Sequence, residues 1–227
     1  MENKDREQGK EKLREEYPYL MELDSNGYDS LKKGSRNIKI ELQRAYPGIK
    51  WSVRSESYSM GCSIDVRWTD GPTPNQVEEI SGKYQQGRFN GMEDIYEYSR
   101  NIWVDVFGGA KYVQTQREYS KEAYLWAVKE VERTWGVKVK VTESSYGSIY
   151  IAREDDIKIQ NSNRWASQEV NQALRERDFT KTDEEIETER ITKEAEDDRR
   201  FEAAFRGSEE TRIKAIEEAM EKESQIG

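Results

Sequence analysis

Histidine is absent from the 227-residue chain, and cysteine occurs once, as Cys62. Without histidine, no imidazole is present to activate a serine or cysteine nucleophile, to ligate a metal or to respond to pH. A single cysteine excludes an intrachain disulfide and a cysteine-cluster zinc site. The composition therefore excludes several common classes of hydrolase and metalloprotein.

Long apolar runs are also missing, and none approaches the roughly 18 residues that a membrane-spanning helix needs. The charged N-terminus does not have the pattern of a signal peptide, so we expect a cytoplasmic protein with no membrane contact. Leu, Ile, Val and Phe together number only 40, and 27 of them fall within residues 31–160. The middle of the chain can bury a hydrophobic core, whereas both ends have little to bury.

The charge is distributed in the same three parts. The net charge of −9 divides into −4 for residues 1–30, +2 for residues 31–160 and −7 for residues 161–227. We therefore predict an acidic N-terminal helical arm over 1–30, a core domain over 31–160 and an acidic C-terminal helical region over 161–227. An acidic chain is poorly suited to bulk DNA binding, but the middle part leaves room for a local basic patch.

Short-range patterns predict the first elements of the core domain. Ser35 is a suitable N-cap for a helix over residues 36–46, which Pro47-Gly48 would end. Residues 49–54 and 64–68 alternate between apolar and polar side chains, as the two strands of a half-buried hairpin do. The side chains expected to point inward are Ile49, Trp51, Val53, Ile64, Val66 and Trp68.

Two more helices and four more strands are predicted further along. Thr73 and Gln76 have the spacing of a capping box, with Pro74 at the first helical position. Ser120 can cap a second helix that Gly136 would end. The strand candidates are residues 102–107, 111–117 and a second hairpin of 137–141 with 148–151.

The two helix–hairpin segments resemble each other in sequence. Glu41-Leu-Gln-Arg-Ala-Tyr-Pro-Gly-Ile-Lys-Trp-Ser-Val53 is similar to Glu130-Val-Glu-Arg-Thr-Trp-Gly-Val-Lys-Val-Lys-Val141. The similarity indicates either an internal repeat or the common pattern of a helix, a glycine and a strand. We predict an α+β fold in which two αββ units form one antiparallel sheet, with helices on one face and charged helical arms on either side.

The other face of this predicted sheet is the candidate binding surface. Basic residues would be displayed on it and could bind a nucleic acid backbone or a partner protein. These residues are Lys50, Arg54, Arg67, Lys138 and Lys140. The alternative is an ordinary solvated face, because Glu56 and Asp65 can pair with cations across the hairpin.

Acidic residues give little support for catalysis. Asp65, Asp70 and Asp105 on predicted strands could begin a metal-dependent nuclease site, but no complete motif follows. Pairs of adjacent acidic residues occur elsewhere in the chain. Two neighbouring carboxylates on a helix point in different directions, so we interpret these pairs as solvent-exposed charges and not as a metal site. We expect no catalytic residue, no metal site and no cofactor, and hence a protein that is not an enzyme.

The acidic C-terminal region has thin apolar stripes. Thr182 and Glu185 have the spacing of another capping box. Ser208 would begin a last helix that carries Ile213, Ile216 and Met220 at helical spacing. Such stripes suit an extended arm, or a helix that packs on a partner, better than an independent domain.

Several sequence blocks between residues 31 and 150 resemble the large polyvalent protein-associated domain of the twenty-ninth class. The most specific blocks contain Ser-Val-Arg54 and Asp-Val-Arg-Trp-Thr-Asp-Gly-Pro72. The other blocks are Ser35-Arg-Asn-Ile, Tyr46-Pro-Gly-Ile-Lys-Trp, Ser57-Tyr, Gly61, Val77, Gly87, Phe89-Asn-Gly-Met92 and Phe107-Gly-Gly-Ala-Lys-Tyr112.

The resemblance implies a setting in phages, plasmids or conjugative elements, beside anti-restriction and DNA-processing domains. It implies a role in countering host defence or in handling DNA, and it supplies no catalytic residue. A free-standing copy with acidic arms suits an inhibitor of the anti-restriction or anti-CRISPR type. We expect a host defence protein or nucleoprotein as its partner in the bacterial cytoplasm. The alternative is an accessory module that binds DNA or RNA.

Overall fold

A three-stranded sheet lies at the centre of the computed structural model, in the order β1 (Ser52–Tyr58), β2 (Gly61–Thr69) and β5 (Tyr112–Glu118). The structure describes residues 2–24, 27, 29–90, 92, 95–98, 101–160 and 162–182, with 184, 185, 188, 191, 192, 194–196, 199 and 200. β1 and β2 form the predicted antiparallel hairpin, whereas β5 runs parallel to β2. The α+β class is confirmed, but the prediction of an antiparallel sheet is wrong for β5.

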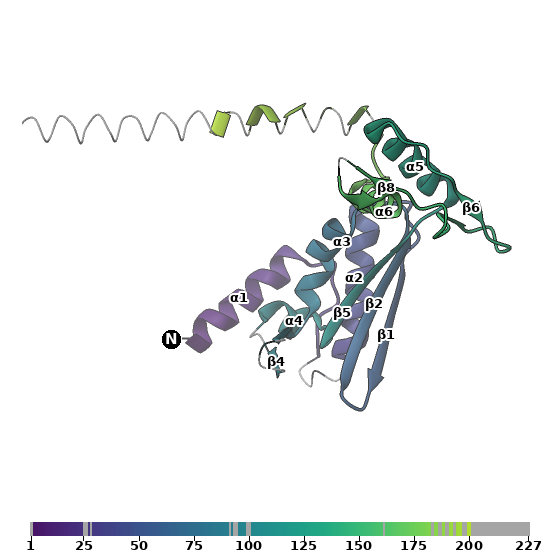
Figure 1. The fold of residues 1–227 in the computed structure, drawn as a ribbon. Helices are drawn as coiled ribbons and strands as arrows, with labels where there is room; N and C mark the ends of the chain where they lie inside the picture. Colours follow the sequence, from purple (N-terminus) through teal and green to yellow (C-terminus); the bar gives the residue numbers. More distant parts are fainter. Residues whose placement is uncertain are drawn as a thin grey trace, which may run out of the picture. The chain divides into compact units, whose positions relative to one another are not determined.

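Helices cover one face of this sheet (Figure 1). α2 (Ser30–Ala45) packs on β1 and β2, and α3 (Pro74–Ser81) packs on β5. α3 continues into the short 3₁₀ helix η1 (Gly82–Tyr84). The Thr73–Gln76 capping box is present, because each side chain bonds the backbone N–H of the other residue. The connection from β2 to β5 begins with α3 and η1 and also contains α4, and this long crossover allows the two strands to run parallel.

The prediction of a strand over residues 102–107 is wrong. This segment is the helix α4 (Ile102–Phe107), which packs against α1 (Glu2–Glu16) and α2. The Asn101 side chain accepts a hydrogen bond from the Trp103 N–H and caps the helix. Trp103, Val104, Val106 and Phe107 are all buried, so the apolar residues that suggested a strand reflect burial of α4 on several sides.

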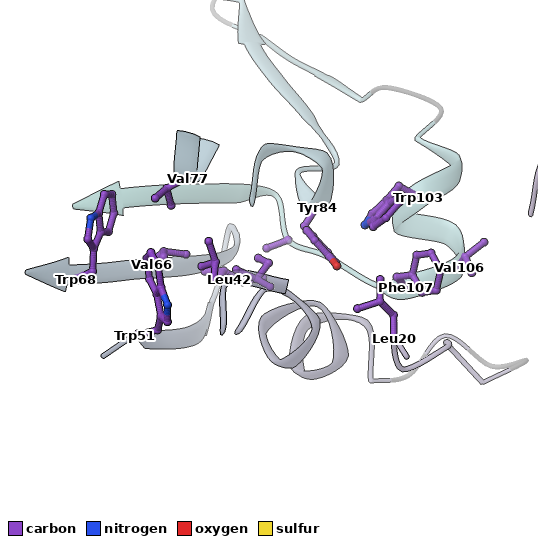
Figure 2. Packing of buried hydrophobic residues seen from close by; sticks show 13 residues of the cluster. Leu20, Leu42, Trp51, Val66, Trp68, Val77, Tyr84, Trp103, Val106 and Phe107 are labelled. Carbon is purple, nitrogen blue, oxygen red and sulfur yellow. The ribbon is translucent and has the colours of Figure 1, made fainter. Parts of the chain in front are cut away.

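The first hydrophobic cluster fills the space between the sheet and the helices (Figure 2). Aromatic rings lie at both ends of it, and the Trp51 and Trp68 ring centroids are 5.5 Å apart. At the other end the Tyr84 and Trp103 rings are 5.6 Å apart. The inward residues predicted for the hairpin all belong to this cluster, Ile49 and Val53 as half-buried members.

A second hydrophobic cluster follows β5. It is formed mainly by α5 (Lys121–Trp135) and α6 (Ala166–Glu176), with Ile159 buried beside them. Small hairpins lie around it: β6 (Thr142–Glu143) with β7 (Ile149–Tyr150), and β8 (Lys158–Ile159) with β9 (Arg164–Trp165). Ser120 and Gly136 bound α5 as predicted.

The predicted pairing of two αββ units in one sheet is not confirmed. Within the part of the chain that is described, β6 and β7 pair only with each other, and residues 137–141 are not a strand. β3 (Gly87–Asn90) and β4 (Ile95–Tyr98) form a further separate hairpin. The similarity between residues 41–53 and 130–141 therefore reflects a helix followed by a glycine and an extended segment, not a shared sheet.

Arg117 connects the two clusters through backbone carbonyl groups. Its guanidinium donates to the carbonyls of Asp70 and Gly71, at 2.8 and 2.7 Å, in the turn after β2. It also donates to the carbonyls of Leu174 and Arg177, at 3.1 and 2.8 Å, at the end of α6. Burial lowers the pKa of Arg117. Arg117 thus joins the two clusters, and its positive charge lies at the C-terminal end of α6, where the helix dipole is negative.

The chain divides into a compact unit over residues 1–180 and a second unit over residues 181–227. The first unit includes α1 and α6, which the charge distribution had placed in the two arms. In the second unit the predicted capping box is present, since the Thr182 N–H donates to Glu185 and the Glu185 N–H donates to Thr182. The predicted last helix from Ser208, with Ile213, Ile216 and Met220, lies outside the described residues.

Candidate functional site

Alternation along the β1–β2 hairpin places polar side chains on the face of the sheet that α2 and α3 do not cover. Ile64, Val66 and Trp68 point into the core, so their neighbours point outward. In the hairpin register Arg54 lies opposite Asp65, and Ser52 lies opposite Arg67. The open face therefore displays two arginines with an aspartate between them.

These side chains line a hollow of about 300 Å³. Its lining residues are Ser52, Arg54, Ser55, Glu56, Asp65 and Arg67. Arg54 and Arg67 are exposed and Asp65 is half-buried. Among the described residues, none of these three side chains has a hydrogen bond or an ion-pair partner. Glu56 likewise has no such partner there, so the hollow offers two guanidinium groups and two carboxylates that can make polar contacts.

β5 extends the polar face. In the parallel register Gln114 lies beside Asp65 and Gln116 beside Arg67, and both glutamines are exposed. Each amide can donate and accept hydrogen bonds next to the charged groups. These two glutamines are not among the predicted binding residues, although the alternation of Val113-Gln-Thr-Gln-Arg117 indicates that they share a face.

The structure separates the five predicted binding residues. Lys50 lies just before β1 and is exposed. Like Arg54, it occupies a polar position in the alternating pattern of residues 49–54. Lys138 and Lys140 are not on the three-stranded sheet, so the prediction that all five share one sheet face is wrong. They lie between α5 and β6 because residues 137–141 do not join the sheet.

Both of these lysines have acidic partners. The Lys138 Nζ lies 3.6 Å from Glu132, and the Lys140 Nζ lies 3.0 Å from Asp155. The backbone N–H of Val139 also donates to Glu132 and holds the pKa of that carboxyl below its ordinary value. Lys138 and Lys140 therefore take part in ordinary surface ion pairs. That they also bind a partner stays a prediction.

Many other residues of the sequence blocks have structural roles. Asp70 has a positive φ of 54°, and its side chain accepts the Ser120 N–H that precedes α5. The Trp68 indole donates to the Pro72 carbonyl at 3.0 Å. Gly108 and Gly109 lie close to α2, where a Cβ on Gly108 would be 2.3 Å from the Ser30 carbonyl oxygen. These residues maintain turns and close packing, whereas the side chains of Arg54, Asp65 and Arg67 bond no side chain or backbone group in the described part of the chain.

The three aspartates considered for a metal site lie on different elements. Asp65 is in the hollow, Asp70 caps α5, and Asp105 on α4 forms an ion pair with Arg6. In the described part of the chain, no group of three or more Cys, Asp or Glu side chains could hold a metal ion. No helix there is both long enough and apolar enough to cross a membrane.

One comparison with known proteins finds a similarity in the part of the chain that carries the hollow. No curated protein and no solved structure matches the chain. A family model, that of large polyvalent protein associated domain 29, matches residues 29–120. This range begins just before α2 and ends after β5, and it confirms the resemblance expected from the sequence, although it stops short of residue 150. The sheet and its hollow thus lie within the range that is similar to large polyvalent protein associated domain 29.

Proposed function

We propose that this protein is a non-enzymatic binding protein of a phage or mobile element that counters host defence in the bacterial cytoplasm. Its partner would be a defence nucleoprotein, such as a restriction or CRISPR effector. The observation that supports this proposal is the hollow with two exposed arginines, Arg54 and Arg67, that have no partner within the described residues. The family match supplies the mobile-element setting.

The chemistry of the hollow suits a surface that combines phosphate and protein groups. The guanidinium forks can bind phosphate or carboxylate oxygens in a bidentate manner. Asp65 and the glutamines of β5 can accept or donate hydrogen bonds to bases or peptide groups. The net charge of −9 disfavours naked nucleic acid, so a nucleoprotein that also offers cationic protein surface fits better.

A pull-down from lysate of a bacterial host tests this proposal. Tagged protein is incubated with lysate, with and without nuclease, and captured proteins are identified by mass spectrometry. We expect a defence effector to survive nuclease treatment, and purified effector to bind the purified protein. The Arg54→Ala/Arg67→Ala variant should bind about a hundredfold more weakly, because two charged hydrogen-bonding groups are lost.

The matched control is Arg153→Ala/Arg175→Ala, which removes two exposed arginines outside the hollow. It should bind as the wild type does. Equal binding by the wild type and the Arg54→Ala/Arg67→Ala variant would show that the hollow is not the binding site. Absence of any defence effector after nuclease treatment would contradict the proposed partner.

The same arginines favour a second candidate, an accessory module that binds nucleic acid directly. Tyr58 is exposed on the same outward side of β1 and could stack on a base. Binding of labelled DNA and RNA oligonucleotides at several salt concentrations tests this candidate. Tight binding that weakens steeply with salt, together with loss of all captured proteins after nuclease, would select it over the inhibitor.

A further inference from the structure

β1 is an unpaired edge of the central sheet. It bonds β2 on one side, and within the described residues no other strand or side chain bonds its free side. Residues 54–58 are all exposed, and the strand contains no proline, glycine or bulge that would block pairing. Proteins usually protect such edges because the free backbone groups can recruit another strand.

The sequence of β1 is complementary to itself in the antiparallel direction. Arg54 and Glu56 lie on either side of Ser55, and both point to the open face of the sheet. When a second copy of the strand runs antiparallel with Ser55 opposite Ser55, Arg54 of each copy lies opposite Glu56 of the other. Directly opposite charges of unlike sign stabilise a strand pair.

We propose that two copies of this chain associate through β1 with Ser55 opposite Ser55. The result is a continuous six-stranded sheet with a two-fold axis perpendicular to it at Ser55. Such an interface closes on itself and gives a dimer, not an open fibre. Because the axis is perpendicular to the sheet, the open faces of both copies form one surface that carries both hollows.

The charges select this register over its neighbours. A shift that keeps the same side chains on the open face places Arg54 opposite Arg54, or Glu56 opposite Glu56. Like charges directly opposite each other destabilise a strand pair, so the neighbouring registers are disfavoured. Arg54 and Glu56 have no ion-pair partner among the described residues, so pairing breaks no existing contact there.

Arg54 takes part both in this pairing and in the proposed binding hollow, but the dimer needs no host component and can be tested on its own. Sedimentation velocity of the purified full chain over a wide concentration range provides the test. We expect a monomer–dimer equilibrium for the wild type. The single variants Arg54→Glu and Glu56→Arg should each weaken the dimer about tenfold or more, because each places like charges opposite one another at both pairs.

An equimolar mixture of the two single variants is the decisive measurement. One strand then carries two glutamates and the other two arginines, so the mixture should form a heterodimer about as strong as the wild-type dimer. The doubly exchanged variant, Arg54→Glu with Glu56→Arg, should also dimerise. Restored pairing in the mixture also demonstrates that both single variants are folded.

Three outcomes would overturn the inference. They are a wild type that stays monomeric at all concentrations, single variants that dimerise as the wild type does, and a mixture that stays monomeric. Arg153→Glu changes an exposed charge away from β1 and serves as the control, with no expected effect. A failed pull-down with an intact dimer would contradict only the proposed function.

Discussion

At the scale of single residues, buried polar groups on α2 hold the neighbouring helices and segments against it. Asn37 is fully buried and donates to the carbonyls of Met21 and Phe107, at 2.8 and 2.9 Å. It also accepts the Met21 N–H. One amide thus holds the segment after α1 and the end of α4 against α2.

A second buried group is Glu41, which accepts hydrogen bonds from the Tyr84 hydroxyl and from Lys83 at 2.6 Å. The Lys83 ammonium also lies 4.0 Å from the centre of the Trp103 ring. Burial and the neighbouring Glu41 charge raise the pKa of Tyr84, so the phenol stays protonated and remains a donor. A carboxylate in this position depends on both partners.

We predict that Tyr84→Phe destabilises the protein by about 1 to 3 kcal/mol, because Glu41 loses one donor in a buried position. Urea unfolding followed by circular dichroism measures the change. Tyr150→Phe is the control, since Tyr150 is largely exposed, and it should be neutral. Equal stabilities for the two variants would show that the Tyr84–Glu41 hydrogen bond contributes nothing.

Arg117→Lys should cost about 2 to 4 kcal/mol in the free energy of unfolding, although the charge is kept. An ammonium cannot reach the turn carbonyls and the α6 carbonyls together, so several buried acceptors lose their donor. The same urea experiment applies, with Arg153→Lys as the exposed control. A loss below about 0.5 kcal/mol would contradict the role assigned to Arg117.

At the scale of elements, α2 approaches the Gly108–Gly109 backbone so closely that a side chain does not fit. A Cβ on Gly34 would lie 2.6 Å from the Gly109 nitrogen and 2.7 Å from its Cα. The Gly109 N–H donates to the Ser30 carbonyl at 3.1 Å. The glycines on both sides of this contact allow helix and loop to touch through their backbones.

Gly34→Ala should therefore destabilise the protein by more than about 2 kcal/mol, even though alanine favours helices. Gly9→Ala in α1 is the matched control, because its Cβ would lie 3.5 Å from the nearest atom of Ile102. There we expect a gain of about 0.5 to 1 kcal/mol. Thermal unfolding distinguishes the two, and a stabilised Gly34→Ala variant would be inconsistent with the close contact.

Helices and strands whose signals lie within a few residues of each other in the sequence could be predicted. Thr73 and Ser120 mark the starts of α3 and α5, and the alternation in residues 49–68 predicts the hairpin and its inward face. Residues 102–107 were misassigned because Ile-Trp-Val-Asp-Val-Phe suits a strand by propensity, whereas packing against α1 and α2 makes it a helix. Local preference is outweighed there by burial.

The candidate site could be predicted only in part. Arg54 and Arg67 share one face because they belong to a single hairpin with a short connection. Lys138 and Lys140 were assigned to that face through an assumed pairing of distant strands, and such pairing depends on the whole fold. The same reason explains why Gln114 and Gln116 were missed, since only the parallel pairing of β5 brings them beside the hollow.

At the scale of the whole molecule, both hydrophobic clusters lie within residues 1–180. We predict that a chain ending at Thr180 keeps the wild-type melting temperature. A chain ending at Trp165 should lose much of its stability, because it lacks α6 and leaves α5 uncovered. Circular dichroism on heating measures both, and a destabilised 1–180 chain would contradict the division into units.

The contacts of Arg117 with α6 have a consequence for how the chain holds that helix. The family match ends at residue 120, so it includes Arg117 and the turn at Asp70 but not α6. Arg117 donates to main-chain oxygens at the end of α6, and its guanidinium also lies 5.2 Å from the centre of the Phe179 ring just after that helix. The hydrogen bonds to main-chain oxygens do not depend on which side chains the helix carries. The matched range therefore holds the helix that follows it through the helix backbone, whatever side chains that helix presents to Arg117.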